Sequence, residues 1–416
     1  MNQLPHPLRA CAAAAATLCI SSVAHAQFST DGYLRAGTGA GTKNNSVQCF
    51  GLDGAGLKYR LGNECDTYVE INLKNTTKVG DLQFSGNIMP VYSGAGSKAS
   101  AQDLGQAFIE GSGFDIAPKV NFWIGKRYYG RTDIHITDTK YTQLDGTGGG
   151  ADNIDLAGGK LGVSYFRRDT GFAGWGTASR VNVEYSTSNV NPGGWLRLVA
   201  GFVTSEEDKD KDGNTLEGRN GTSFTIQHYQ DKLFGLGGGN TVWVQFARGS
   251  AALNGGFANA FSGNGNDWIL TTPDGTTFVE DHGTPSSKRI ADAFTWQVGD
   301  LAGQAVAHVQ DDDHLQFKTR STSLGGRAAY SFTNNFKLVG EVGYSTKKPG
   351  DAATQKLAKA TIAPTLSIGR GLMDRPELRL FYTRARWNAP ASAGGNGLPA
   401  NDTSGTRYGV QAEIWW

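Results

Sequence analysis

Apolar and polar residues alternate along many short segments of this chain, with a repeat of two residues. In residues 66–73, Val69, Ile71 and Leu73 fall on one face of an extended strand, and the other face is polar. Residues 377–387 alternate as well, with one face carrying Leu378, Leu380 and Tyr382 and the other carrying Arg379, Phe381, Thr383, Ala385 and Trp387. The same pattern recurs in residues 82–88, 180–186, 195–203, 241–247 and 335–344. It predicts an all-β protein of many strands, each about ten residues long.

The C-terminal end of the chain carries the most diagnostic of these patterns. One face of the last strand is apolar and consists of Tyr408, Val410, Ala412, Ile414 and Trp416. The opposite face carries Gly409, Gln411, Glu413 and Trp415. A closing strand with an apolar face and a terminal aromatic ring is typical of outer-membrane β-barrels. A soluble β-sandwich is the alternative, in which the apolar face would line a sealed core.

Residues 1–26 have the pattern of a cleaved secretory signal peptide. Arg9 supplies a positive charge, an apolar run follows over residues 10–23, and residues 24–26 (Ala-His-Ala) fit the small-x-small cleavage rule. This run is too short for a membrane-spanning helix, and no longer one follows it. We therefore expect residues 27–416 to form one exported domain, a transmembrane antiparallel β-barrel in the outer membrane of a Gram-negative bacterium.

Length sets the expected number of strands. The mature chain has 390 residues (416 − 26), and roughly 22 residues per strand and connection give about 18 strands. Barrels of about 16 to 18 strands enclose an aqueous channel rather than a packed interior. Segments rich in Gly, Ser, Asn and Asp are expected to be the long loops: 37–56, 93–103, 145–152, 204–222, 248–289 and 388–406.

Charge and motifs exclude several classes of function. The chain has 39 Lys plus Arg and 38 Asp plus Glu, so the mature chain, which lacks Arg9, is formally neutral. It has no basic block that would bind nucleic acid. No HExxH, CxxC or P-loop motif is present, and we expect no enzyme activity, no metal and no cofactor. Cys49 and Cys65 remain in the mature chain, where an oxidising compartment favours one disulfide over two free thiols.

Aromatic rings share strand faces with polar groups at four places. The four rings are Tyr33, Tyr68, Trp387 and Trp415. Tyr33, for example, shares its face with Arg35. If these faces line water, the rings can bind the apolar C–H faces of pyranose sugars, while the neighbouring charges bond to the hydroxyl groups. Each ring alone is compatible with filling space at the barrel wall, but four together favour a row of weak sugar-binding positions.

Four segments resemble maltoporins, the maltodextrin-selective porins, and they appear in the order found in that family. They are residues 58–68 (KYRLGNECDTY), 125–135 (GKRYYGRTDIH), 191–194 (NPGG) and 413–416 (EIWW). The resemblance implies an 18-stranded barrel, a homotrimer with one pore per subunit, and a third loop folded inward as a constriction. It also implies that a disulfide between Cys49 and Cys65 staples the first external loop.

The resemblance also assigns site residues. Maltoporins line their pore with an aromatic path, the greasy slide, and flank it with charged residues, the polar track. The slide positions correspond to Tyr33, Tyr68, Trp387 and Trp415, with Phe257 or Phe261 as a fifth residue. The track positions correspond to Arg35, Arg60, Glu70, Arg131, Asp133 and Asp138, and Lys140 stands at the constriction.

The sequence departs from maltoporins at three places. Residues 93–103, expected to form the second loop, contain no tryptophan, whereas the family uses one there to begin the slide of a neighbouring pore. Ile109 stands where the family has a track arginine. Lys140 stands where it has the constriction tyrosine, although Tyr141 is adjacent. These changes favour a sugar that is shorter than a maltodextrin, or one whose negative charge Lys140 attracts.

These patterns together predict a porin through which oligosaccharides diffuse passively. Its expected partners are the sugar solutes, the outer-membrane lipid and two further copies of the chain. A general diffusion porin without a sugar site is the first alternative. A barrel enzyme or adhesin is the second.

Overall fold

The computed structural model of the chain describes most of the predicted mature protein. The described residues are 27–41, 49–52, 57–94, 101–168, 178–209, 215–216, 220–255, 269–271, 277–279, 285–313, 318–393, 398–399 and 402–416. The predicted signal peptide, residues 1–26, lies outside them, as do Phe257 and Phe261. None of the helices in the described ranges is long and apolar enough to cross a membrane.

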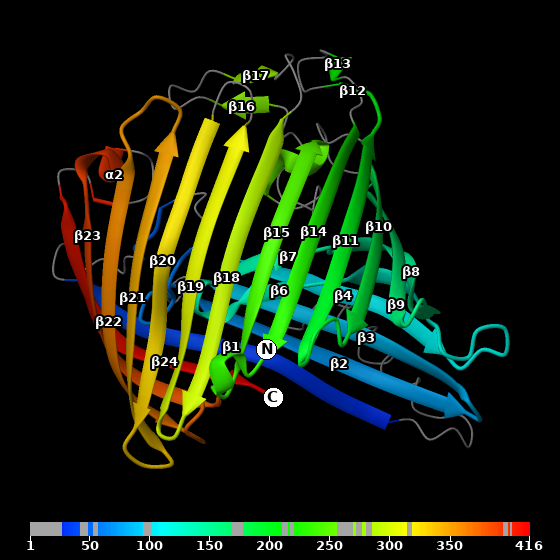
Figure 1. The fold of residues 1–416 in the computed structure, drawn as a ribbon, viewed down its shortest axis with the longest axis horizontal. Helices are drawn as coiled ribbons and strands as arrows, with labels where there is room; N and C mark the ends of the chain where they lie inside the picture. The colour runs from blue at the N-terminus through cyan, green and yellow to red at the C-terminus, as the bar shows by residue number, and fades with distance from the viewer. Residues whose placement is uncertain are drawn as a thin grey trace, which may run out of the picture.

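Eighteen of the described strands form one closed antiparallel sheet (Figure 1). The sheet closes because β1 pairs with both β2 and β24. The barrel strands are β1 (Gln27–Gly41), β2 (Thr67–Val79), β3 (Leu82–Gly94), β4 (Ala101–Ser112), β5 (Asn121–Arg127), β8 (Gly146–Leu156), β9 (Gly159–Arg168), β10 (Ala178–Ser188), β11 (Gly194–Ser205), β14 (Asn220–Asp231), β15 (Gly239–Gly249), β18 (Ser286–Val298), β19 (Leu301–Asp313), β20 (Lys318–Ser331), β21 (Phe336–Pro349), β22 (Gln355–Ser367), β23 (Glu377–Trp387) and β24 (Ser404–Trp415). The predicted fold class, a barrel of about 18 strands, is confirmed.

Shorter elements lie in the connections between the barrel strands. They are β6 (Thr132–Ile134), η1 (His135–Thr137), β7 (Thr139–Thr142), β12 (Asp208–Lys209), β13 (Thr215–Leu216), η2 (Leu233–Gly235), η3 (Ser250–Gly255), β16 (Ile269–Thr271), β17 (Thr277–Val279) and α2 (Ala389–Ala393).

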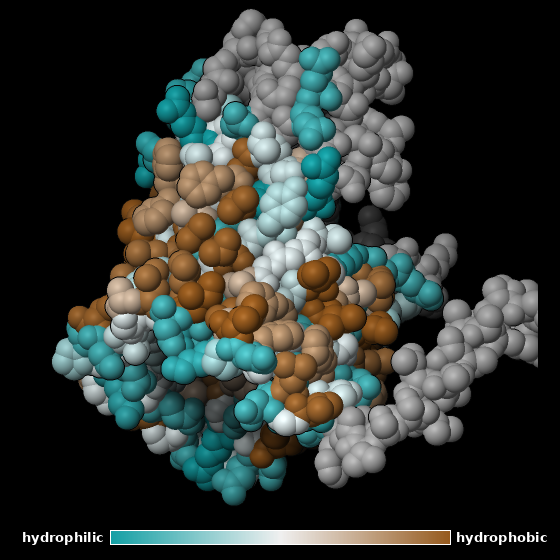
Figure 2. Space-filling view, turned by 90° about the vertical axis from the view of Figure 1, so that its right-hand side faces the viewer, coloured by the Kyte–Doolittle hydropathy of each residue, from teal (hydrophilic) through white to brown (hydrophobic). Residues whose placement is uncertain are grey.

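Residues on each barrel strand face alternately outward and inward. On β23, Leu378 and Leu380 face outward and are 59% and 60% exposed, whereas Arg379 and Thr383 face inward and are buried. Apolar side chains gather across the middle of the outer surface, with hydrophilic ones above and below them (Figure 2). This distribution is the reverse of a soluble protein's, and it suits a wall that meets lipid on the outside. The predicted alternation is thereby confirmed.

The expectation of a long loop over residues 145–152 is wrong, because this segment forms the beginning of β8. Its glycines allow neighbouring groups to approach the strand closely. A Cβ on Gly148 would lie 1.9 Å from the carbonyl oxygen of Tyr165, and one on Gly150 would lie 2.8 Å from the indole nitrogen of Trp123. Glycine here reflects close packing of a strand rather than a turn.

The third external loop, residues 128–145, folds into the barrel as the resemblance implies. It leaves β5, contains β6, η1 and β7, and returns into β8. The backbone carbonyl of Tyr141 accepts hydrogen bonds from Gln245 (2.6 Å) and Arg289 (2.9 Å), which face inward from β15 and β18. The apolar side chains of the loop join a buried cluster on this wall, which consists of Ile134, Ile136, Tyr141, Trp243, Ala291, Ala293 and Val306.

The first external loop, between β1 and β2, also enters the barrel and pairs with the third. The backbone N–H of Lys58 donates to the carbonyl of Thr137, and that of Arg60 donates to the carbonyl of Ile136, both at 2.9 Å. The two loops are therefore joined by main-chain hydrogen bonds inside the barrel, and their side chains form one site.

Two further contacts fix the first loop. The predicted disulfide between Cys49 and Cys65 is present. The ring of Tyr59 fills a notch on the inner wall where Gly325 of β20 and Gly343 of β21 stand opposite each other. A Cβ on Gly343 would lie 2.3 Å from this ring, so the notch requires glycine.

The connection between β22 and β23, residues 368–376, folds into the barrel from its other end. Leu372 of this turn and Leu61 of the first loop belong to one buried cluster on the inner side of β19–β23. Lys337 donates a hydrogen bond to the carbonyl of Gly371 at 2.6 Å. The interior beside these strands is therefore packed, and the polar residues of the predicted site lie along β1, β2, β24 and the third loop.

Candidate functional site

Three of the predicted slide residues form a continuous aromatic row on the inner wall. Tyr33 of β1 stands beside Trp415 of β24 in register, and Tyr68 follows on β2. The ring centroid of Tyr33 is 6.1 Å from that of Tyr68 and 6.5 Å from that of Trp415. All three side chains are partly exposed. The row therefore presents apolar ring surface to the interior of the barrel.

Arginines lie over the two tyrosine rings of this row. The guanidinium carbon of Arg35 is 5.0 Å from the centre of the Tyr68 ring, and that of Arg60 is 5.7 Å from the centre of the Tyr33 ring. These distances are within the range of cation–π contacts. Arg60 also donates a hydrogen bond to the Tyr33 hydroxyl, so the row combines ring faces with polar groups.

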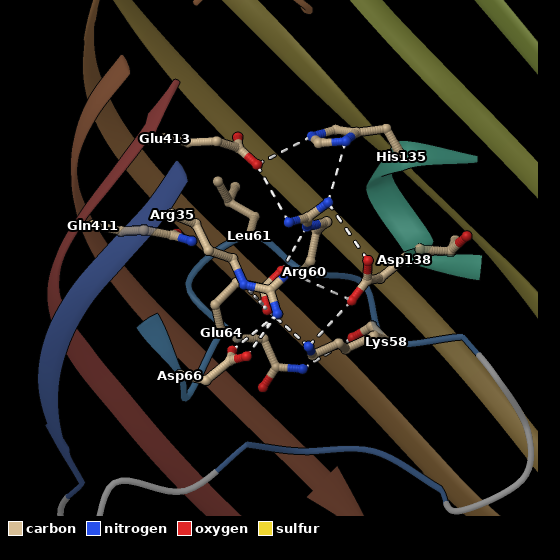
Figure 3. Close-up of polar contacts among 12 residues, drawn as sticks. Arg35, Lys58, Arg60, Leu61, Glu64, Asp66, His135, Asp138, Gln411 and Glu413 are labelled. Carbon is tan, nitrogen blue, oxygen red and sulfur yellow. Dashed lines mark hydrogen bonds and ion pairs between the residues drawn. The ribbon is translucent and has the colours of Figure 1, made fainter. Parts of the chain in front are cut away.

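Carboxylates from both inward-folded loops bind these cations (Figure 3). Glu64 of the first loop contacts Arg60 at 2.5 Å and Lys58 at 2.7 Å. Asp138 of the third loop contacts Lys58 at 3.3 Å and Arg60 at 3.6 Å. Arg35 lies 3.5 Å from Glu64 and 3.8 Å from Asp138. Three of the predicted track residues, Arg35, Arg60 and Asp138, thus form one connected network with Lys58 and Glu64.

Glu413 of β24 connects the aromatic row to the rest of this network. The Tyr33 hydroxyl donates a hydrogen bond to one of its oxygens at 2.8 Å, and His135 lies 3.4 Å from the same oxygen. Arg379 and Arg375 donate to the other oxygen at 2.5 Å and 2.8 Å. Because Glu413 is almost fully buried, these four partners fix its position.

The tip of the third loop carries charges that are exposed inside the barrel. Asp133 and Lys140 are partners in the β6–β7 pairing, and both are exposed. Neither forms an ion pair within 4 Å with any part of the chain that the structure describes. Arg131, in contrast, donates to both carboxylate oxygens of Asp145 at 2.9 Å, and its guanidinium lies over the Tyr128 ring. Lys140 thus has no ion pair among the described residues, and its ammonium lies 6.0 Å from the centre of the Tyr128 ring.

The structure changes the interpretation of two positions at which the sequence departs from the family pattern. Tyr141 is buried and stacks on Trp243 with ring centroids 4.8 Å apart, so Lys140 rather than Tyr141 faces the interior. The expectation that Ile109 occupies a track position is wrong. Ile109 is 60% exposed on the outer wall and pairs with Ile124 of β5.

Trp387 lies apart from the aromatic row. It is 5% exposed, and its ring centroid is 5.8 Å from that of Phe50 within a buried cluster of the external loops. Glu70, another predicted track residue, accepts a hydrogen bond from the Tyr68 hydroxyl at the row itself. The structure thus brings together three of the four described slide positions and most of the track.

Burial and neighbouring charges shift the pKa values of two groups on the third loop. Burial lowers the pKa of His135 to about 4, although the hydrogen bond to Glu413 opposes this shift. Burial alone would raise the pKa of Asp138, but the cations Arg60 and Lys58 outweigh it and hold this pKa below its usual value. At neutral pH His135 is therefore uncharged and Asp138 is ionised.

Some residues of the site were not predicted from the sequence. Lys58 and Glu64 lie within the first segment that resembles maltoporins, and His135 ends the second, so a signal for them was present. Arg375 lies in a turn without alternation, and nothing in the sequence points to its contact with the site. The arrangement as a whole offers stacking surfaces, hydrogen bonds and fixed charges.

Three solved outer-membrane proteins illustrate the structures to which this chain is similar. The trimer form of OmpT from Vibrio cholerae has 9% identity and a TM-score of 0.45, over 94% of this chain and 99% of that one. An anion-selective porin from Comamonas acidovorans has 9% identity and a TM-score of 0.47, over 94% and 100%. The outer membrane protein opdK from Pseudomonas aeruginosa has 12% identity and a TM-score of 0.48, over 94% and 99%.

The family comparison covers nearly all of the predicted mature chain. Residues 28–416 match the LamB porin family from the first barrel strand to the last. The match agrees with the closed barrel, its apolar outer wall and its inward-folded third loop. Both the family and the fold are those of a channel of the Gram-negative outer membrane. The chain belongs to the LamB porin family.

Proposed function

We propose that this porin is selective for sugars and lets oligosaccharides cross the outer membrane by passive, saturable diffusion. The observation that carries the proposal is the row formed by Tyr68, Tyr33 and Trp415, with Arg60 and Glu413 beside it. A pore without solute selectivity needs only a charged, hydrated interior. A row of partly exposed aromatic rings is not required for such diffusion.

The chemistry of the row suits a pyranose sugar. The C–H face of the sugar would stack on a ring, and its hydroxyl groups would exchange hydrogen bonds with Arg35, Arg60 and Glu70. Neighbouring rings about 6 Å apart offer overlapping positions, so a sugar would move along the row without entering one deep energy minimum. No covalent step is needed, and the concentration gradient drives the transport.

The kind of sugar that is preferred is inferred from the tip of the third loop, the predicted constriction. Lys140 is exposed there and has no carboxylate within ion-pair distance in the described part of the chain. This supports a substrate that is shorter than a maltodextrin or carries a carboxylate, such as a uronate. Asp133 stands opposite Lys140 and would hydrogen bond to sugar hydroxyls. A homotrimer with one pore per subunit, as the family resemblance implies, completes the proposal.

Single-channel current in planar bilayers tests this function. We expect the current to fall in a saturable way as sugar is added, with uronates blocking at lower concentration than neutral maltose analogues. If neither sugar blocks the current, the chain is a general diffusion porin, the first alternative. If uronates and neutral maltose analogues block the current at the same concentration, the sugar site is supported and the proposed role of Lys140 is refuted.

A further inference from the structure

A belt of exposed cations lies on the outer surface of β15 and β18–β23, at the rim from which the long connections after β15 and β23 leave. Long connections of outer-membrane barrels lie on the extracellular side, so this is the extracellular rim. The belt consists of Arg248, Lys288, Lys318, Arg320, Lys348, Lys356, Arg384 and Arg386, all of them exposed. Each points outward, because it alternates with inward-facing residues of its strand. Arg320, for example, shares the outer face of β20 with Leu324, which is 66% exposed.

The charge of this belt is mostly uncompensated. Lys318 lies 3.1 Å from Asp313, and Arg320 lies 3.7 Å from Asp311. The other six cations form no ion pair with any part of the chain that the structure describes. Unpaired cations in a row at the edge of an apolar wall repel one another, and an external anion would relieve this repulsion.

On the opposite wall of the barrel, the described residues form no such belt. Among the described residues of β1–β5 and β8–β11, the outward cations at the same rim are Lys126 and Arg167. Each faces a carboxylate, Asp103 at 3.4 Å and Glu206 at 3.7 Å. The excess of positive charge is thus confined to one side of the barrel.

Two grooves lie one below the other on the basic side. The upper groove, about 420 Å³, is at the rim and is lined by Lys288, Arg320 and Lys348 together with carboxylates of β19. The lower groove, about 550 Å³, crosses the same strands and is lined largely by small or apolar residues, among them Gly326 and Gly340. Gly326 is six residues below Arg320 on β20, or about 20 Å along the strand. The lower groove therefore extends from the belt, where Arg384 lines it, into the apolar band.

We propose that this wall binds a phosphate-bearing lipid of the outer leaflet, with its headgroup in the upper groove and an acyl chain in the lower one. Lysine and arginine form charge-assisted hydrogen bonds with phosphate oxygens, and basic residues at a membrane surface attract anionic lipids. The small residues of the lower groove leave room for a hydrocarbon chain beside the wall. The proposal depends on the outer-membrane location and not on sugar selectivity.

Native mass spectrometry of the mature protein in detergent tests the headgroup contact. The probe is bis-phosphorylated lipid A, compared with the same lipid after removal of both phosphates. We expect the phosphorylated lipid to bind more tightly, and K288Q/K348Q to weaken its binding roughly 30-fold. The matched control K126Q/R167Q removes two outward cations from the opposite wall and should bind like the wild type. Equal binding of the two lipids, or no loss in K288Q/K348Q, would overturn the proposal.

A second variant tests the acyl groove without changing any charge. A Cβ at Gly340 meets no atom within 4 Å, so Gly340→Leu fits the wall and fills the groove. We expect this variant to bind lipid A several-fold more weakly, and unchanged binding would refute the acyl contact. Heat-dependent gel mobility verifies that each variant is a folded barrel. Block of the current by sugar should stay unchanged in all of them, which separates this test from that of the proposed function.

Discussion

The guanidinium carbon of Arg375 lies 4.4 Å from the centre of the indole ring of Trp415. Arg375 reaches this position from the inward-folded turn between β22 and β23, and its side chain is fully buried. Ion pairs to Glu413 at 2.8 Å and Glu377 at 3.1 Å hold it there. A residue of the turn thus fixes the orientation of a ring in the aromatic row.

Arg375→Gln should therefore loosen Trp415 and weaken sugar binding. Loss of one cation–π contact of about 1 kcal/mol corresponds to a loss of affinity of roughly fivefold. Titration of single-channel current with sugar measures this change, and the open-channel conductance should stay within the wild-type range. Arg370→Gln is the matched control, because Arg370 is exposed on the same turn and pairs with Asp300. Equal sugar affinity in both variants would remove Arg375 from the site.

Trp415→Ala and Trp387→Ala should have different effects. Removal of the Trp415 ring takes a stacking surface out of the row, so sugar affinity should fall by roughly 1–3 kcal/mol with little change in ion conductance. Trp387 packs against Phe50 in a buried cluster, so its removal should lower the stability of the outer loops by about 3–5 kcal/mol. Current block measures the first effect, and protease sensitivity of the loops measures the second. Loss of sugar affinity in Trp387→Ala with intact loops would show that Trp387 also meets the sugar.

Lys140→Gln should reduce the preference for anionic solutes. Lys140 is exposed at the constriction, and one charge at close range is worth about 1 kcal/mol where water is nearby. Block by a uronate should therefore need roughly five times more solute, while block by neutral maltose changes little. The reversal potential in a salt gradient should shift toward cations. Lys126→Gln, on the outer wall, serves as the control, and a shift of the same size in that variant would contradict the role of Lys140.

Cys65→Ser should destabilise the first loop and leave the barrel sheet intact. The Cys49–Cys65 bridge closes a segment of the loop with a sequence separation of 16 residues. Such a bridge contributes about 3 kcal/mol to stability. We expect faster proteolysis of the first loop and noisier single-channel current, because this loop pairs with the third loop at Arg60. Heat-dependent gel mobility should remain that of a folded barrel. Unchanged proteolysis would mean that Tyr59 and its glycine notch suffice to hold the loop.

The pH dependence of stability should contain a contribution from His135. Burial lowers its pKa to about 4, below the value of about 6.5 of an unfolded chain. The unfolded state therefore binds a proton first, and the contribution is fully present above pH 6.5 and lost as pH falls toward 4. It amounts to about 3 kcal/mol. The difference in free energy of unfolding between wild type and His135→Asn, measured from pH 8 to pH 4, tests this expectation, and a difference independent of pH would contradict it.

The sequence by itself determined which residues face lipid and which face the interior. On β23 the strand bounds Glu377–Trp387 and both faces agree with the alternation, since the repeat of two is a local property of an extended chain. The strand number followed from length, and the disulfide followed because only Cys49 and Cys65 remain in the predicted mature chain. The loop predicted from local composition at residues 145–152 was wrong. The glycines there allow close contact between neighbouring strands and do not form a turn.

Only the tertiary structure decided which of these residues meet. Tyr33 and Trp415 lie at opposite ends of the chain and become neighbours because the sheet closes in one register. The inward-folded turn brought Arg375 to Trp415, and packing against Phe50 took Trp387 away from the row. Alternation reports only on each strand and its two faces, whereas closure and the docking of loops depend on contacts between residues far apart in sequence. The site is built from such contacts.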